Sequence, residues 1–451
     1  MKKQYMKATK VATAVALCAM GMTCVAPAHA ETEIEALKRE LAEQRELINK
    51  LLAAQASQKE SIEKIEARPV QPLAQANNSA IALPKGLTVY GTMDVNVANN
   101  NSGYGRKTTV GSAGMTATSI GIKGEKGLAE GLRAVGEVEM GVDLSTGVAG
   151  NGPNASGINA GVPSGGGFIG NGNQLFSRQA YAGLASDIYG TLVLGRQYSG
   201  SYIAAATQGN VFGVGFYGNS TLFLPLIGGM PTRLNNAIVY KSPSFAGFSV
   251  YATYTAGNEN NVNSTILSGT SRMTDSSGAG WDVALFYRRQ ALNAALSVWS
   301  VKNAAFADQE TGLAKKAGWQ VAANYDFGLF RLFGNFFSGK ISGGNYENVT
   351  KTLSKAHGWS LSAGVPYGRH TFMASYARLD DKSLLHQDAS AIGIAYTFKL
   401  YDATWLYVSY GKMMNKRNST YSLGNGGDLV GSPSAPGFQP NGVMLGLNFK
   451  F

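Results

Sequence analysis

The chain ends in the stretch Val443-Met444-Leu445-Gly446-Leu447-Asn448-Phe449-Lys450-Phe451, and this stretch decides the fold. Its large apolar side chains occupy every second position, and smaller or polar residues fill the positions between them. Successive side chains of a β-strand point to opposite faces, so this period of two predicts a strand with one apolar face. The same alternation recurs over 87–97, 132–142, 248–254, 281–287, 319–327, 359–365 and 392–398. The sequence therefore predicts an all-β protein.

The connections between these strands distinguish a β-sandwich from a membrane barrel, because both classes use strands with one apolar face. Short turns at 187–190, 242–247, 326–328 and 366–368 alternate with long polar stretches, at 99–116, 145–174, 199–235, 258–278, 303–316, 343–356 and 416–438. This alternation, with aromatic residues near strand ends, is typical of outer-membrane barrels. We predict a sixteen-stranded antiparallel transmembrane β-barrel over 86–451, with its weakest strand patterns near 116–124 and 236–242. An even number of strands puts both barrel ends on the short-turn side, in the periplasm.

The composition fits this class of protein. The 451 residues include 57 Gly and only 15% charged residues, whereas soluble domains carry about 25% charged residues. After the first 30 residues, no stretch approaches the roughly 20 continuous apolar residues that a spanning helix needs. The composition excludes a disordered chain and argues against a helical membrane protein, so any membrane crossing must use strands.

Residues 1–30 are predicted to be a secretory signal peptide. Lysines precede an apolar run over 11–25, and Ala28-His29-Ala30 forms a small-x-small cleavage site. The two cysteines, Cys18 and Cys24, both lie in this segment, and neither follows the small residue that lipid attachment requires. The mature chain then begins near Glu31 without cysteine; the alternative is an uncleaved anchor, for which the apolar run is short.

Residues 31–68 differ in kind from the rest of the chain, because they contain no Gly and sixteen charges of both signs. Their apolar residues recur at heptad spacing and form a predicted seam of Ile34, Leu37, Leu41, Ile48, Leu51, Ile62 and Ile65. Charges on both flanks of the seam favour a parallel α-helical coiled coil over a single amphipathic helix lying on a surface, and isoleucine at both core positions favours three or more chains. Residues 69–85, which include three prolines, are predicted to be a semi-rigid linker between this periplasmic coil and the barrel.

Several motifs resemble those of a known family. They are Leu87-Thr88-Val89-Tyr90-Gly91, the stretches 119–125, 190–196 and 236–248, and the terminal Phe451. In this order they resemble the Gram-negative trimeric porins, the general diffusion porins of β-proteobacterial type. The resemblance implies a homotrimer in the outer membrane, in contact with lipid and lipopolysaccharide, with Phe451 as the end that the barrel-insertion machinery recognises. It also implies a water-filled pore narrowed by the third long loop; the N-terminal coiled coil is a departure that a minority of porins share.

In that scheme the constriction loop is 199–235, and its composition is unusual. The loop contains no Asp or Glu, and Arg233 is its single charge. It is instead rich in large apolar and aromatic residues, namely Tyr202, Phe212, Phe216, Tyr217, Leu222, Phe223, Leu224 and Leu226. We expect these residues to pack the loop against the inner wall; the alternative is an apolar track for solutes with an organic body and an anionic group.

The predicted wall opposite the loop is basic. By strand phase Lys123 and Arg133 point inward near the short turns and line the periplasmic mouth, whereas Arg178 and Arg196 lie nearer the loop, where Glu139 partly offsets them. Leu192 and Leu194 share the parity of Arg196, so all three face the lumen if Arg196 does. For each charge the alternative is a solvated residue without a role in selection.

Enzymatic and nucleic-acid functions are not supported by the sequence. The mature chain has three His residues, none at metal-ligand spacing, and no Gly-x-Ser-x-Gly motif. Basic residues are scattered, and no cofactor is expected. We therefore predict a passive channel for small hydrophilic solutes, with a preference for anions such as organic acids. The alternative is a structural or adhesive protein whose coil tethers the outer membrane to peptidoglycan.

Overall fold

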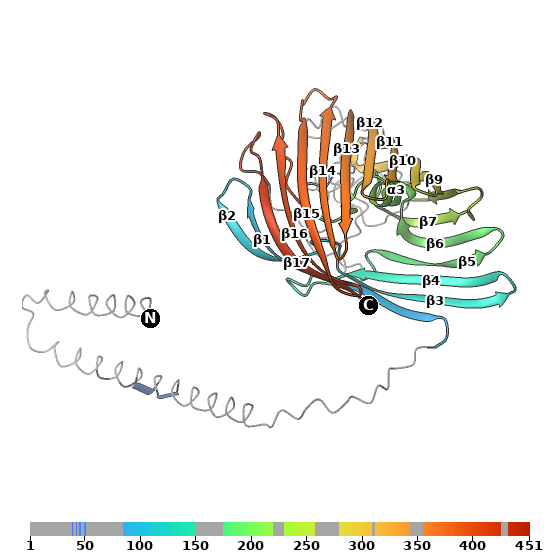
Figure 1. Cartoon of the computed structure of the whole chain (residues 1–451), viewed down its shortest axis with the longest axis horizontal. Helices are drawn as coiled ribbons and strands as arrows, with labels where there is room; N and C mark the ends of the chain where they lie inside the picture. Colours follow the sequence, from blue (N-terminus) through green and yellow to red (C-terminus); the bar gives the residue numbers. More distant parts are fainter. Residues whose placement is uncertain are drawn as a thin grey trace, which may run out of the picture. The chain divides into compact units, whose positions relative to one another are not determined.

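The computed structural model describes residues 84–149, 175–219, 230–257, 279–308, 312–342, 355–424 and 432–451, together with six residues between 38 and 50. The chain divides into two units, Met1–Ala82 and Leu83–Phe451. The second unit is built on a single antiparallel sheet that curves round and closes on itself (Figure 1).

The sheet of the second unit contains seventeen strands, and one described helix follows β6. The elements are β1 (Leu87–Asn101), β2 (Arg106–Ser112), β3 (Ser119–Ala129), β4 (Leu132–Gly141), β5 (Gln179–Ser186), β6 (Gly190–Tyr198), α3 (Gly200–Gln208), β7 (Arg233–Lys241), β8 (Phe248–Thr255), β9 (Gly280–Arg289), β10 (Leu292–Asp308), β11 (Gly312–Asp326), β12 (Arg331–Ser342), β13 (Lys355–Tyr367), β14 (His370–Asp381), β15 (Ala389–Tyr401), β16 (Thr404–Asn415) and β17 (Asn441–Lys450). Each strand from β3 to β17 pairs with the next, and β17 pairs with β1 to close the barrel.

The strand β1 pairs with two strands on its other side. Its residues 95–101 pair with β2, and its residues 87–92 pair with β3. Because β2 and β3 lie end to end along one neighbour, they form two halves of a single barrel position, interrupted at 113–118. The barrel is therefore sixteen positions around, which confirms the predicted number. The strand that breaks is one of the two with the weakest sequence pattern.

A buried carboxylate holds this interruption together. Asp94 of β1 is fully buried, and its oxygens accept hydrogen bonds from three successive backbone N–H groups of residues 114–116, at 2.8–2.9 Å. The Tyr407 hydroxyl and the Asn448 amide donate to the same carboxylate at 2.6 and 2.8 Å. The segment turns through Ala113, whose φ of 72° is left-handed. Because Asp94 of β1 binds groups from the interruption, β16 and β17, it connects the barrel closure to the break.

The two faces of the strands divide as the alternation predicts. On β12 the side chains of Phe333, Asn335 and Phe337 are buried on the inner side, whereas Phe336 is exposed on the outer side. On β17 Leu445 is 62% exposed and its neighbour Met444 is 1% exposed. An exposed apolar outer face is what a barrel presents to lipid.

The C-terminal residue completes the barrel by pairing with the first strand. The backbone groups of Phe451 and Gly91 exchange two hydrogen bonds, at 3.0 and 3.1 Å. The Phe451 ring lies where a Cβ atom at position 91 would stand, so the glycine in β1 makes room for the terminal aromatic ring.

The first unit is described only at six residues, Lys38, Ala42, Arg45, Glu46, Asn49 and Lys50, all of them helical and exposed. Lys50 and Glu46 form an ion pair of 2.7 Å one helical turn apart. The predicted signal peptide, the coil seam and most of the linker lie outside the described residues, so the coiled coil stays a prediction. No described helix is long and apolar enough to cross a membrane.

Candidate functional site: the pore and its constriction

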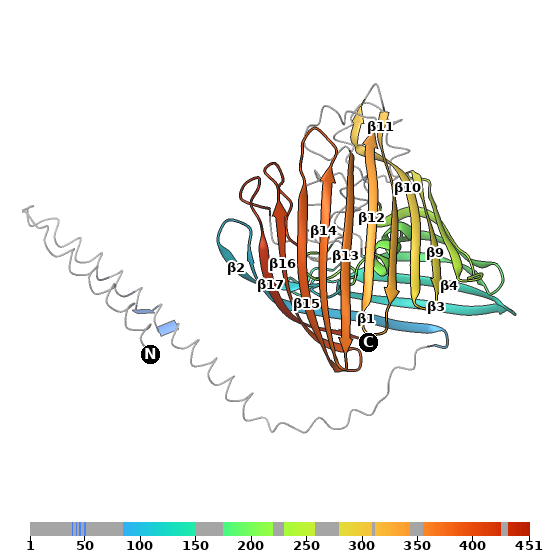
Figure 2. The same ribbon diagram turned by 45° about the horizontal axis from the view of Figure 1, so that its top comes forward.

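The loop that follows β6 folds into the barrel. Its helix α3 lies within the ring of strands (Figure 2). The hydroxyl of Ser199 caps the helix by accepting from Tyr202 N at 3.0 Å. Asp282, fully buried on β9, accepts from Ser201 N at 3.1 Å, and Gln320 of β11 donates to the Ser201 carbonyl. Because a carboxylate is favourable at a helix N-terminus, these contacts fix the start of the loop against the inner wall.

After α3 the loop continues along the inner face of the later strands. Serine hydroxyls on three strands bind it, through the pairs Asn210–Ser375, Val211–Ser362 and Tyr217–Ser409, at 3.0–3.2 Å. The loop then reaches the interruption between β2 and β3, where Phe216 N donates to the Gly114 carbonyl at 2.7 Å. The described loop thus follows the wall from β9 to β16 and ends beside the Asp94 network.

Glycines on the inner wall make room for this loop. A Cβ atom at Gly364 of β13 would lie 2.8 Å from the Val211 side chain, and one at Gly411 of β16 would lie 2.5 Å from Tyr217 Cβ. A Cβ atom at Gly393 of β15 would lie closer still to the Tyr217 carbonyl oxygen. Glycine within a strand often marks a close backbone approach, and here the approaching backbone is the loop.

The aromatic residues of the loop serve this packing. Phe212, Phe216 and Tyr217 are each 3% exposed and belong to the larger core cluster. Phe216 packs edge-on against Tyr407, with ring centroids 5.7 Å apart. These three residues therefore do not form an apolar track for solutes, whereas Leu222, Phe223, Leu224 and Leu226 lie outside the described residues.

The inner face of β3 to β7 faces the loop across the barrel, and it carries a charged cluster. At its centre Glu137 accepts hydrogen bonds from Tyr90, Gln179 and Tyr181 at 2.5–2.8 Å. The Lys123 ammonium lies 3.9 Å from the same carboxylate and 4.4 Å from the Tyr90 ring centroid. Three donors and a cation therefore surround the negative charge of Glu137.

Two arginines flank a pair of stacked tyrosines beside this cluster. Arg178 Nε donates to Glu139 Oε1 at 2.7 Å, and its guanidinium carbon is 5.7 Å from the Tyr198 ring centroid. The guanidinium carbon of Arg233 is 4.5 Å from the same centroid, and its Nη2 donates to the Tyr198 hydroxyl at 2.8 Å. Tyr198 stacks on Tyr202 of α3, with centroids 5.4 Å apart. Glu139 offsets Arg178, whereas Arg233 has no acidic partner among the described residues.

Strand parity places Arg196 on the same face as Leu192 and Leu194, but Arg196 is buried whereas the two leucines are exposed. Its Nε donates to the Ser177 carbonyl at 2.8 Å and its Nη1 donates to Asn235. The guanidinium therefore connects the segment before β5 to β7. Leu192 and Leu194 are 50% and 57% exposed on the outer face, so they do not face the lumen. The register shift at Gly195, whose φ is 130°, breaks the alternation before Arg196. The prediction that Leu192 and Leu194 face the same side as Arg196 was therefore wrong, because a bulge lies between them.

Arg133 lies at the short-turn end, as its place in the sequence suggests. Its guanidinium is 3.0 Å from Glu125 and 2.9 Å from Asp187 of the next turn. At the short-turn end of β7, the Lys241 ammonium lies 5.4 and 5.1 Å from the ring centroids of Tyr181 and Tyr251. Two acids thus offset Arg133, while Lys241 adds positive charge to the cluster.

Sequence reasoning missed part of this cluster. Glu137 shares the strand face of Glu139, so parity could have found it, but Lys241 and Tyr198 give no local signal because their partners come from other strands. Within the described ranges, no group of three or more His, Cys, Asp or Glu side chains could hold a metal ion.

A closed antiparallel barrel with a loop packed along its inner wall defines a class of protein, the outer-membrane channels. The sequence profile described as Gram-negative porin matches residues 70–418, and the chain belongs to this family.

Comparisons with individual proteins agree with this assignment. Outer membrane porin protein 32 of Delftia acidovorans is 25% identical over 384 residues, which cover 83% of this chain and 97% of that protein. An outer membrane porin of Bordetella pertussis is 25% identical over 317 residues, covering 65% and 76%. The fold is similar to that of an anion-selective porin from Comamonas acidovorans, with a TM-score of 0.64, 23% identity and coverage of 81% and 99%. It is also similar to a trimer form of OmpT of Vibrio cholerae, with a TM-score of 0.57, 13% identity and the same coverage.

Proposed function

We propose that this porin, a passive diffusion channel for small hydrophilic solutes, prefers small anions, including organic acids. The observation that carries the proposal is the charge of the wall facing the loop. Its cations are Lys123, Arg178, Arg196, Arg233 and Lys241, and its anions are Glu137 and Glu139. Five positive charges against two leave an excess of three on that wall.

The described loop does not cancel this excess. Between 199 and 235 the sequence has no acidic residue, and the nearby carboxylates Asp94 and Asp282 are fully buried beneath the loop. In a narrow pore with low-dielectric walls, fixed charge of one sign raises the local concentration of the opposite ion. The anion selectivity of the Comamonas porin, a protein of the same fold, supports the proposal.

The reversal potential of purified trimers in a planar bilayer under a KCl gradient tests this preference. We expect the sign that corresponds to chloride permeation, and potassium preference at low salt would contradict the proposal. Liposome swelling in sugars separates the channel from a purely adhesive protein, because only a channel lets the sugars enter.

We further propose that the chain forms a homotrimer whose N-terminal segment is a periplasmic coiled coil. The heptad seam over 34–65 and the trimeric form of a protein of the same fold support this arrangement. Outer-membrane lipid, lipopolysaccharide, the barrel-insertion machinery and peptidoglycan are the partners that this placement makes available.

Deleting residues 31–68 is expected to lower the temperature at which trimers dissociate in detergent while single-channel conductance stays nearly unchanged. A coiled coil adds contacts between chains, but it lies outside the pore. Gel mobility after heating and single-channel recording measure the two effects. A large loss of conductance per inserted channel would mean that the segment plugs or gates the pore.

Adding a short polar tail after Phe451 is expected to reduce the amount of folded trimer in the outer membrane several-fold. The tail must leave from the place where the Phe451 backbone pairs with Gly91, so it disturbs both barrel closure and the free aromatic end. Heat-modifiable protein in membrane fractions measures the effect. The same tail inserted before Glu31 is the control, and equal surface levels for both proteins would show that the free end has no special role.

A further inference from the structure

Two aspartates on the inner wall are fully buried, but their carboxylates are compensated differently. Asp94 accepts five hydrogen bonds from backbone and side-chain donors. Asp282 of β9 accepts a hydrogen bond at Oδ1 from Ser201 N at 3.1 Å, whereas its Oδ2 has no partner among the residues that the structure describes. Because a buried charge is costly unless it is paired and hydrogen-bonded, Asp282 needs a further compensating group.

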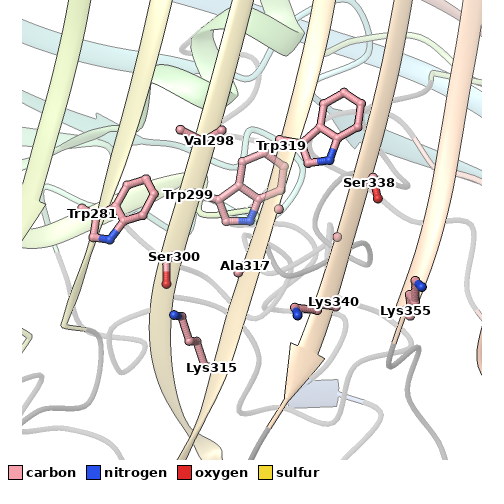
Figure 3. A pocket seen from close by; sticks show the side chains of 12 residues that line it. Trp281, Val298, Trp299, Ser300, Lys315, Ala317, Trp319, Ser338, Lys340 and Lys355 are labelled. Carbon is pink, nitrogen blue, oxygen red and sulfur yellow. The ribbon is translucent and has the colours of Figure 1, made fainter.

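The side chain of Asp282 points into the barrel together with those of Ser297 on β10 and Gln320 on β11. A residue next to each of them lines a hollow on the outer face of the barrel (Figure 3), namely Trp281, Val298 and Trp319. Successive side chains of a strand alternate between its two faces. Asp282, Ser297 and Gln320 therefore lie on the inner face, and all three are fully buried.

Four further buried oxygen atoms near this carboxylate have no hydrogen-bond partner within the described part of the chain. They are Ser201 Oγ, Thr253 Oγ1, Ser297 Oγ and Gln320 Oε1. Thr253 is directly opposite Asp282 across β8 and β9, and Ser297 is directly opposite Gln320 across β10 and β11. Side chains directly opposite each other on one face are close neighbours, so these residues form two adjacent pairs.

Ser201, in the first turn of α3, connects the two pairs. Its N–H donates to Asp282, and its carbonyl accepts from the amide nitrogen of Gln320, which leaves Gln320 Oε1 as an acceptor. A Cβ atom at Gly200 would lie 2.9 Å from the Ala284 Cβ and 3.1 Å from Asp282 Oδ1. The helix thus begins in direct contact with this part of the wall, and the five oxygen atoms belong to one buried patch.

The charge of this patch is negative. No Lys, Arg or His side chain in the described ranges forms an ion pair with Asp282. Lys316, a buried lysine of β11, lies two strands away, in register with Val301 and Gly280. The N-terminus of α3 contributes about half a unit of positive charge. The remaining charge is matched by a monovalent cation, whereas a divalent cation would bury an excess of positive charge.

We propose that Asp282 and these four oxygen atoms bind one monovalent alkali cation, such as sodium, between α3 and the inner wall. Carboxylate, hydroxyl and amide oxygens are the ligands that hard cations prefer. Asp282 Oδ2 supplies the negative charge, and the neutral oxygens complete the coordination. The ion fixes the start of the constriction loop to the wall. The proposal concerns the stability of this loop and does not depend on the anion preference of the pore.

The stability of purified trimers in neutral detergent tests the site, with sodium chloride replaced by choline chloride at constant ionic strength and neutral pH. An ion that binds only the folded chain stabilises it in proportion to the logarithm of its occupancy factor. At a sodium concentration ten times the half-saturating one, we expect the unfolding equilibrium constant of the wild type to be about ten-fold lower than in choline chloride. The folded band after incubation in urea measures this constant, and Asp282→Asn is expected to give equal values in both salts.

Two matched serine variants make the test specific. Ser297→Ala removes one proposed ligand and is expected to raise the half-saturating sodium concentration about three-fold. Ser360→Ala removes another buried hydroxyl of the inner wall that has no partner among the described residues, but Ser360 lies on β13, opposite Asn335. We expect this control variant to keep the sodium response of the wild type.

Equal stability of the wild type in sodium and choline salts would overturn the proposal, and so would an unchanged sodium response in Asp282→Asn. Equal shifts in the two serine variants would also contradict it. Stability that rises on acidification without any response to sodium would show that a proton neutralises Asp282 instead. A response that EDTA abolishes in sodium chloride would assign the site to a divalent ion. Reversal potentials decide the anion preference separately, so the two proposals fail independently.

Discussion

Replacing Asp94 with alanine is expected to lower the free energy of unfolding of the barrel by about 3–5 kcal/mol, because it breaks a buried and charged hydrogen-bond network. The substitution leaves three backbone N–H groups at 114–116, the Tyr407 hydroxyl and the Asn448 amide without their acceptor. Each donor left without an acceptor costs more free energy here than it would in water, because the site is fully buried. The midpoint of urea unfolding in detergent, followed by the mobility of the folded band, measures the loss.

Two further variants make the Asp94 result specific. Asp94→Asn keeps the shape but turns an amide donor toward backbone donors, so we expect it to lose stability as well. Asp402→Ala removes an exposed carboxylate whose side chain accepts from Lys399 in a short turn, and we expect the midpoint to stay unchanged. If Asp94→Ala unfolds at the urea concentration of Asp402→Ala, the network does not stabilise the barrel closure.

The same substitution is expected to affect the channel. The Gly114 carbonyl, which lies within the segment that Asp94 holds, accepts from Phe216 N of the constriction loop. A looser segment therefore gives the loop a less fixed anchor, and we expect larger fluctuations of the single-channel current than in wild type. A current as quiet as that of the wild type would show that the serine contacts on β13, β14 and β16 are sufficient to hold the loop.

Local pattern was sufficient to predict the barrel, because strand alternation and turn length are properties of neighbouring residues. It could not predict the interruption at 113–118, which exists because Asp94 of another strand binds that backbone. The same limit applies to Arg196, whose side chain is placed by a bulge at Gly195 rather than by parity. Irregular backbone at these two points depends on contacts between distant segments.

The candidate site was partly predictable for a related reason. The absence of acids from 199–235 could be read directly, and so could Arg178, Arg233 and Glu139 as charges near the loop. The pairing of Arg178 with Glu139 could not be predicted, because the two side chains meet only when β4 and β5 are in register. Whether a charge in a pore is free or offset is decided by such pairing.

The Arg178–Glu139 pair allows a prediction of how a substitution changes the chloride-to-potassium permeability ratio, in direction and in size. Replacing Arg178 with Gln turns the neutral Arg178–Glu139 pair into a single negative charge, so the charge of the wall falls by one unit. At an effective dielectric constant near 20, a unit charge a few ångströms from an ion contributes on the order of 2–4 kcal/mol, and 1.4 kcal/mol corresponds to ten-fold in an equilibrium. Allowing for screening by salt, we expect Arg178→Gln to lower the chloride-to-potassium permeability ratio about three- to ten-fold at 0.1 M KCl.

Matched variants separate this effect from a general loss of charge. Glu139→Gln leaves Arg178 without its acid and is expected to raise the permeability ratio, the opposite of Arg178→Gln. Arg233→Gln removes the same unit of charge from the wall and is expected to lower the ratio by a similar factor. Arg133→Gln, at the mouth between Glu125 and Asp187, is expected to change it little, since charges there are exposed to salt.

Salt dependence provides the decisive control for the selectivity prediction. The Debye length falls from about 10 Å at 0.1 M to about 3 Å at 1 M, so selection by wall charge must weaken over this range, whereas selection by pore width must not. Reversal potentials of the wild type and the Arg178→Gln and Glu139→Gln variants, measured across both concentrations, distinguish the two origins. If both variants shift the ratio in the same direction, the substitutions act by deforming the wall, and the Arg178–Glu139 pair does not set the sign of the permeating ion.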